Sequence, residues 1–109
     1  MLERRERLKL EDGRELRLLS ALEVLEARRE AEGLARGEAE AALCANACLL
    51  ARALETQEGE RVFSSGEAVL SGLRVEEISN LARTWSRFNR EENPPLTLSQ
   101  EQEDEVKKK

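Results

Sequence analysis

The chain has 109 residues and a mass of 12.3 kDa, which fits one domain with a modest hydrophobic core. Charged residues make up 38% and hydrophobic residues 39% of it, a mixture typical of helices with one solvated face. The net charge of −5 argues against a general nucleic-acid binder, which must neutralise phosphates. The sequence has neither an apolar run near the ~18 residues of a membrane helix nor a recognisable signal peptide, so we expect a cytoplasmic protein without a membrane partner.

The chain contains no histidine, which excludes nucleophilic sites built on Ser-His or Cys-His pairs. Cys44 and Cys48 are four residues apart and so share a helical face, but two ligands do not complete a zinc site. We interpret both cysteines as small buried residues. Neither the glutamate pairs nor the glycines have the spacing of a calcium loop or a phosphate-binding loop. The sequence therefore predicts no catalytic residue, no cofactor and no metal.

Residues 8–18 alternate apolar and charged side chains around Asp12 and Gly13, which is the pattern of a β-hairpin. A two-residue loop at Asp12 and Gly13 would place the leucines of the two strands on opposite faces. A three-residue loop at 11–13 places them on one face, as a half-buried sheet requires. We therefore predict a type I turn closed by a bulge, with Gly13 in the left-handed region. The leucines on the common face are Leu8, Leu10, Leu16 and Leu18.

Residues 20–33 are predicted to form the first helix. Ser20 and Glu23 have the spacing of a capping box, and Leu19 and Val24 occupy the positions of a hydrophobic staple. We expect the helix to end near its glycine at position 33. Its predicted apolar side consists of Leu22, Val24, Leu25 and Ala31.

Residues 38–55 are predicted to form the second helix, with Glu38 at its positive end and Arg52 at its negative end. The apolar stripe is rich in alanine and cysteine, which allow neighbouring helices to approach closely. We therefore expect this helix to be the central and most buried one. The stripe consists of Leu43, Cys44, Ala47, Cys48, Leu50, Ala51 and Leu54.

Residues 62–63 are expected to form a short extended piece that touches the hairpin. Ser64 and Glu67 have the spacing of a second capping box, which opens a short helix ending near Gly72. The last helix is predicted from about residue 75 to 93. Its first turn is weakly specified, because an arginine stands at the expected cap position, 74. Its apolar stripe consists of Ile78, Leu81, Ala82, Trp85 and Phe88.

The sequence thus predicts a mainly α fold of the α+β class, with an N-terminal β-hairpin packed on a bundle of about four helices. Residues 1–93 form the single domain. Pro94 and Pro95 forbid continuation of the last helix, and 94–109 is expected to be a flexible, charged tail. The tail ends in three consecutive lysines although the chain otherwise uses arginine almost throughout: Lys107, Lys108 and Lys109.

Four segments together resemble the tail assembly chaperones of long-tailed bacteriophages and prophages. They are LEDGRELR from position 10, LSALEVLEA from position 19, ALCANACLLA from position 42 and ISNLARTWSRFNREENP from position 78. The layout of hairpin, helical body, Trp-x-x-Phe-Asn helix end, Asn-Pro and tail covers nearly the whole chain. The arginine at position 74 and the short tail depart from it.

The resemblance implies a non-enzymatic role in the host cytoplasm. Such chaperones coat the tape measure protein, keep it soluble while the tail tube assembles, and are absent from the mature virion. In many of these phages a ribosomal frameshift yields a longer form that recruits the tail tube protein. The lysine codons at 107–109 are where this chain would carry the slip site, because lysine codons are A-rich.

A holding chaperone needs exposed apolar surface, and we expect that surface on the last two helices. The same face is expected to support homo-oligomer formation. The candidate partner-binding residues are Val69, Leu70, Ile78, Leu81, Trp85 and Phe88.

Two alternatives remain open. One is a small helical regulator or antitoxin-like protein- or DNA-binding module, since single-strand binders combine arginines with aromatic residues, although the acidic total argues against nucleic acid. The other is a structural adaptor or head–tail joining protein, which would stay in the mature particle. The residues that the regulator would use are Arg83, Trp85, Arg87, Phe88 and Arg90.

Overall fold

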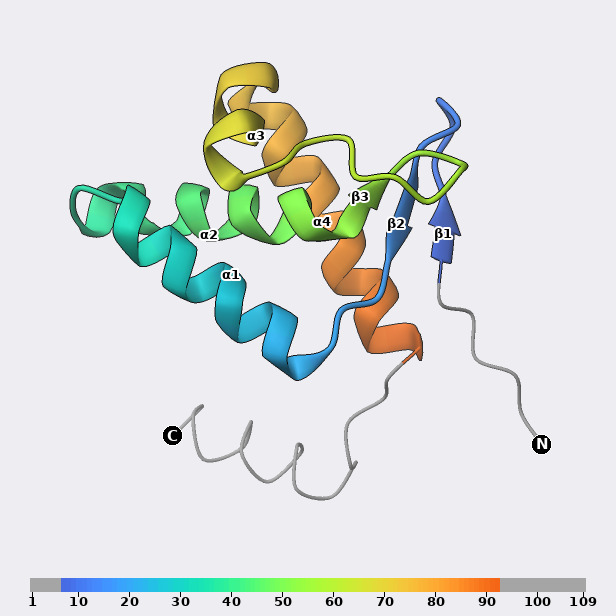
Figure 1. Ribbon diagram of the computed structural model, residues 1–109, viewed down its shortest axis with the longest axis horizontal. Helices are drawn as coiled ribbons and strands as arrows, with labels where there is room; N and C mark the ends of the chain where they lie inside the picture. Colours follow the sequence, from blue (N-terminus) through green and yellow to red (C-terminus); the bar gives the residue numbers. More distant parts are fainter. Residues whose placement is uncertain (1–6, 93–109) are drawn as a thin grey trace, which may run out of the picture.

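The computed structural model describes residues 7–92 and confirms the mainly α fold, with four helices and a small antiparallel sheet (Figure 1). The predicted tail, 94–109, and the lysines at 107–109 lie outside the described residues. Within 7–92, no helix has the length and apolarity needed to cross a membrane. The elements in chain order are β1 (Arg7–Lys9), β2 (Glu15–Arg17), α1 (Ala21–Leu34), α2 (Glu38–Ala53), β3 (Leu54–Glu55), α3 (Gly66–Gly72) and α4 (Val75–Glu92).

The hairpin has the predicted three-residue loop. Leu8 pairs with Leu16, and the amide of Leu10 donates to the carbonyl of Arg14 at 2.8 Å. Gly13 has a φ of 93°, in the left-handed region that a side chain rarely adopts. Leu16 is fully buried, while Leu8 and Leu10 pack against the same core. The demand for one apolar face therefore sets the register.

A third strand, β3, corrects the prediction that the second helix continues to residue 55. The helix ends at Ala53, and Leu54 pairs with Leu16 across the sheet. The sheet order is β1-β2-β3. Pairing with the hairpin overrides helical propensity here, because β2 would otherwise leave a row of backbone groups without partners. The extended piece at 62–63 joins β3, and the amide of Val62 donates to the carbonyl of Leu54 at 3.2 Å.

Helix α1 begins at the predicted capping box, in which the side chain of Ser20 accepts from the amide of Glu23. The predicted apolar side is wrong in part, because Leu22 and Leu25 are 58% and 45% exposed. The side that packs on α2 is centred on Ala27 and Ala31, which are buried. Small side chains let the two helices approach closely, and this close packing turns the two leucines toward solvent.

Helix α2 is the central element, as predicted. It contacts α1, α3, α4 and the sheet, and Figure 1 shows it in the middle of the molecule, with α1 in front of it and α4 crossing behind. The main core gathers Leu16 of the hairpin, α2 residues such as Leu50, and Ile78 and Trp85 of α4. A smaller cluster lies between α1 and α2 and consists of Ala27, Ala31, Cys44 and Cys48.

The caps of the last two helices differ from the predicted ones. Ser65, not Ser64, caps α3, because its hydroxyl accepts from the amide of Ala68 at 3.1 Å. At the start of α4 the side chain of Glu77 replaces the missing cap by accepting from the amide of Arg74 at 3.0 Å. A glutamate can thus satisfy one of the free amide groups of a first turn by itself.

Candidate binding surfaces

The apolar stripe of α4 lies in the interior. Ile78 is 1%, Trp85 6% and Phe88 1% exposed, and Val69 of α3 is fully buried. The other two candidate partner-binding residues, Leu81 and Leu70, are half-buried and pack against the core. Five of the six side chains belong to the main core or pack against it, and Phe88 is buried as well, so none of the stripe forms an open face. Their role in binding a partner stays a prediction, and it would require α3 or α4 to move.

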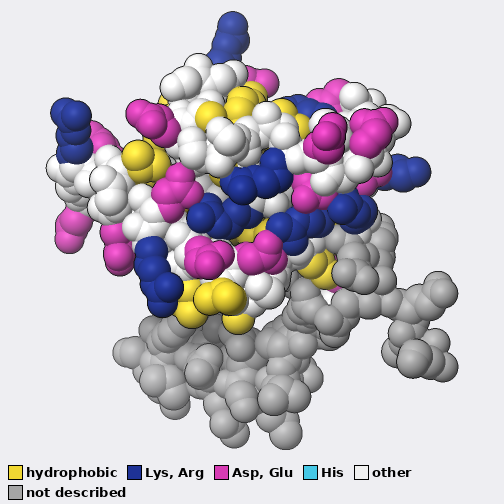
Figure 2. Space-filling view, viewed as in Figure 1, with side chains coloured by type: hydrophobic (Ala, Val, Ile, Leu, Met, Phe, Trp, Pro, Cys, Tyr) yellow, Lys and Arg dark blue, Asp and Glu magenta, His cyan; other side chains and the backbone are white. Residues whose placement is uncertain are grey.

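Exposed apolar surface lies instead on the outer side of α1. Leu22 and Leu25 are three residues apart and therefore neighbours on one helical face. Figure 2 shows hydrophobic side chains gathered at the N-terminal end of this helix. Val75, at the start of α4, is the third exposed large apolar side chain among residues 7–92, at 61%. We call Leu22 and Leu25 the leucine patch.

A groove of about 290 Å³ opens between the C-terminal half of α1 and the N-terminal half of α2. Arg28 and Glu32 form its rim on α1 and stand three and seven residues beyond Leu25, which places the leucine patch beside the same edge. The groove is apolar between these charges. Its remaining lining consists of Ala31, Ala35, Ala41 and Ala45.

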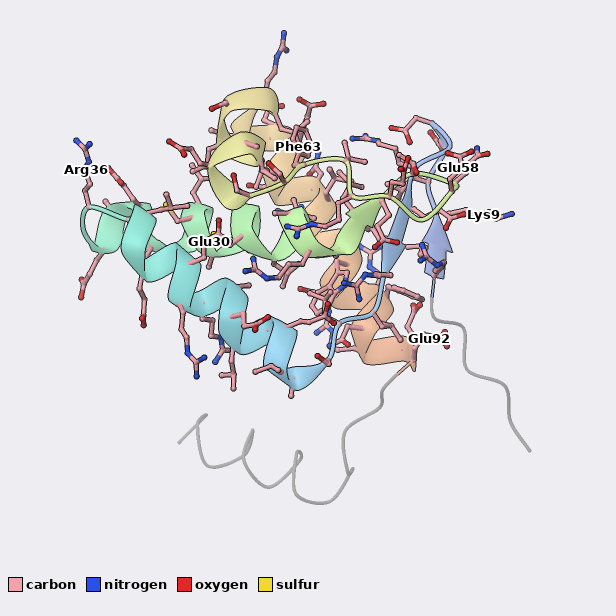
Figure 3. The ribbon with its side chains drawn as sticks, viewed as in Figure 1. Lys9, Glu30, Arg36, Glu58, Phe63 and Glu92 are labelled. Carbon is pink, nitrogen blue, oxygen red and sulfur yellow. The ribbon has the colours of Figure 1, made fainter. Side chains whose placement is uncertain are left out.

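Helices α1 and α2 are held in place behind this groove by the carboxylate of Glu30 (Figure 3). It accepts from Arg52 Nη1 of α2 and from the amide of Gly66 at the start of α3, both at 2.7 Å. Burial acts to raise the pKa of Glu30, but these two donors outweigh it and hold the pKa below its usual value. One side chain therefore fixes three helices relative to one another.

Cys48 lies behind the same carboxylate and is fully buried. Burial, with the nearby charge of Glu30, raises the pKa of its thiol to about 12. Cys44 is also buried, and both thiols are free. A thiol with so high a pKa is not a nucleophile at neutral pH, so the structure agrees with the interpretation of both cysteines as packing residues. Within residues 7–92 no group of side chains has the makings of a metal site.

A second charged network fixes the start of α1 to the sheet. Arg17 of β2 contacts Glu55 of β3 at 2.9 Å and also pairs with Glu23 in the first turn of α1. Arg7 of β1 reaches Glu55 at 2.7 Å and Glu15 at 3.2 Å. The hydrogen bond from Arg17 lowers the pKa of Glu23 to about 2. This network orients the helix that carries the leucine patch.

A third surface is a polar groove of about 310 Å³ between α2 and α4. It contains two guanidinium groups, Arg83 and Arg90, with Ala82 buried at its floor. A single-strand binder would stack its aromatic residues on bases, but Trp85 and Phe88 lie on the buried side of α4. Only the arginines of this helix reach the surface. The remaining lining residues are Asn46, Ser79 and Ser86.

Neither groove was predicted from the sequence. The sequence predicts both residues of the leucine patch on the apolar side of the first helix, together with Ala31, and it assigns no role to the other three alanines of the α1–α2 groove. The seven-residue spacing of Arg83 and Arg90, matched by Ser79 and Ser86, was a signal for the polar groove. Comparisons with protein-family models, with curated proteins and with solved structures found no match.

Proposed function

We propose that this protein is a phage tail assembly chaperone that binds the tape measure protein and keeps it in solution in the host cytoplasm while the tail assembles. The sequence resemblance supplies the identity of the client. The leucine patch beside the α1–α2 groove is the observation that supports a binding role. Apolar side chains exposed on a small domain, next to an apolar groove, suit contact with another polypeptide.

The binding mode we propose is a client helix laid along α1. A large apolar side chain of the client enters the alanine-lined groove, while its neighbours cover Leu22 and Leu25. Arg28 and Glu32 at the rim are exposed and take part in no ion pair within residues 7–92, so both are available to charges on the client. Helix-in-groove recognition of this kind uses anchors three and four residues apart.

Light scattering of the tape measure protein, with and without this chain, tests the proposal. The wild-type chain should suppress aggregation at a near-equimolar ratio. Replacing Leu22 and Leu25 by serine should raise the amount needed at least fivefold. The matched control replaces Glu76 and Arg87 by serine, which also leaves net charge unchanged and alters exposed positions of α4, away from the leucine patch. A wild-type chain that leaves aggregation unchanged would contradict the function, and equal action of all three proteins would contradict the surface.

The groove has its own test. Ala41 is exposed at the groove edge, so replacing it by phenylalanine fills the groove without changing the core. This variant should lose suppression as the leucine variant does. The corresponding change at Ala39, which is exposed on the same helix and does not line the groove, should have no effect. Client binding unaffected by Ala41→Phe would place the contact elsewhere.

A frameshift-extended form that recruits the tail tube protein belongs to the same proposal, and the nucleotide sequence at the lysine codons 107–109 tests it. The alternative, a small helical regulator or antitoxin-like module, is supported by the exposed arginines of α4. Gel shifts at rising salt separate the two, because specific DNA retention at moderate salt would favour the regulator.

A further inference from the structure

The polar groove between α2 and α4 has two unpaired cations. Within residues 7–92, neither Arg83 nor Arg90 forms an ion pair. The two residues are seven apart on α4, which separates their Cα atoms by about 10 Å along the helix. Ser79, Ser86 and Asn46 add hydroxyl and amide groups between and beside them. The groove is therefore built for a ligand with more than one negative charge.

The same chain contains such a ligand a short distance beyond α4. Four of the five residues at 101–105 are acidic, and position 101 comes nine residues after Glu92, the last residue of the helix. Nine residues reach at most about 30 Å, whereas the groove from Arg90 to Ser79 runs about 16 Å along α4. The connection is therefore long enough for the acidic segment to lie along the groove, antiparallel to α4.

We propose that the acidic segment 101–105 binds the α2–α4 groove of its own chain, with its carboxylates on Arg83 and Arg90. Single exposed ion pairs are weak, but a covalent connection of this length gives an effective concentration in the millimolar range, so weak pairs suffice. The bound segment covers the basic groove and withholds it from other anions. This inference does not depend on the proposed function.

A spin label at the end of the acidic segment tests the inference in the full chain. Val106→Cys provides the attachment point, while the native thiols are buried. With the segment in the groove, the nitroxide should broaden the amide signal of Ser79, at the end of the groove far from Glu92, at least threefold at low salt. Arg83→Gln with Arg90→Gln should remove this broadening, as should neutralising the four acidic residues.

Two controls separate docking from general proximity. Arg74→Gln with Arg87→Gln removes the same charge from exposed arginines that do not line the groove, and should keep the broadening. Replacing the lysines at 107–109 by glutamine should keep or strengthen the broadening, because the arginines of the groove repel the positive charges of these lysines. Equal signal intensities in all variants would overturn the proposal. So would an oligonucleotide that binds the wild-type groove as tightly as it binds the acid-neutralised chain.

Discussion

Trp85 Nε1 donates a hydrogen bond to the carbonyl of Arg17 at 2.8 Å, which joins the middle of α4 to the end of β2 across 68 residues of sequence. The indole ring is 6% exposed and belongs to the main core. A buried tryptophan is normally placed so that its N–H finds a partner, and here the partner is the strand that also receives Leu54. This bond locks the last helix against the sheet.

Trp85→Phe should therefore lower the free energy of unfolding by about 1–3 kcal/mol, because it leaves the carbonyl of Arg17 without its donor. Trp85→Ala should lower it by about 3–5 kcal/mol through the cavity it creates. Urea denaturation measures both. Arg87→Ala, on an exposed position two residues along, should change the value by less than about 0.5 kcal/mol. Equal stability of the phenylalanine variant and wild type would show that the bond contributes nothing.

Adding one methyl group at Gly66 and at Gly33 should have opposite effects on stability. A Cβ at Gly66 would collide with the Sγ of Cys48 and lie 3.1 Å from its Cα, so α3 cannot approach α2 as closely with any side chain there. Gly66→Ala should lower the free energy of unfolding by about 1–3 kcal/mol. At Gly33 a Cβ meets nothing within 4 Å, and Gly33→Ala should stabilise the helix by up to about 1 kcal/mol.

Thermal unfolding of the two glycine variants is the measurement. The midpoints should move in opposite directions from that of wild type. A Gly66→Ala variant as stable as wild type would mean that α3 can shift away from Cys48 at no cost, and the position of α3 would then be less well defined than the contacts indicate.

The hairpin shows how much of the fold could be predicted from sequence. One requirement, that its leucines share a face, was enough to fix loop length, register and the conformation of Gly13. The capping box of Ser20 and Glu23 likewise predicted where α1 begins. Local patterns failed where a tertiary contact decides. Leu54 continues the apolar stripe of the second helix in sequence. It belongs to strand β3 instead, because β2 offers a free edge with which it pairs.

The candidate site was predicted less well for a related physical reason. Leu22 and Leu25 have the hydrophobicity of core residues, but the side of α1 facing α2 is chosen by close packing of alanines. Hydrophobicity alone does not show which of two apolar sides a neighbour will cover. The large aromatic residues of α4 were expected at the centre of the core or of a partner surface, and the structure places them in the core.

Glu23 should make stability depend on pH in the acid range. Its pKa is lowered from the usual 4.5 to about 2 in the folded state, mainly by the hydrogen bond from Arg17. A lowered folded pKa means that the stabilisation is complete above pH 4.5 and is lost as pH falls toward 2. Glu23→Gln should therefore flatten the decline in unfolding free energy between about pH 5 and pH 2. At pH 7 the variant should be less stable by about 1 kcal/mol, since the pair is partly solvated.

Urea titrations at several pH values between 2 and 7 measure this effect. Glu26→Gln is the matched control, because Glu26 is exposed on the same helix and forms no ion pair within residues 7–92. Its curve should follow that of wild type. A Glu23→Gln curve with an undiminished acid slope would mean that other carboxylates carry the dependence.

The two native thiols should be unreactive in the folded protein. Cys48 is fully buried with a pKa of about 12, and Cys44 is 4% exposed, so neither offers an accessible thiolate at pH 8. Iodoacetamide should modify them at least a hundredfold more slowly than an introduced cysteine at the exposed Ala39 of the same helix. Mass spectrometry counts the alkyl groups, and in strong denaturant both native thiols should react at the rate of the introduced one. Rapid modification of Cys48 in the native state would mean that α1 and α3 open together around Glu30, because those two helices and α2 enclose the thiol.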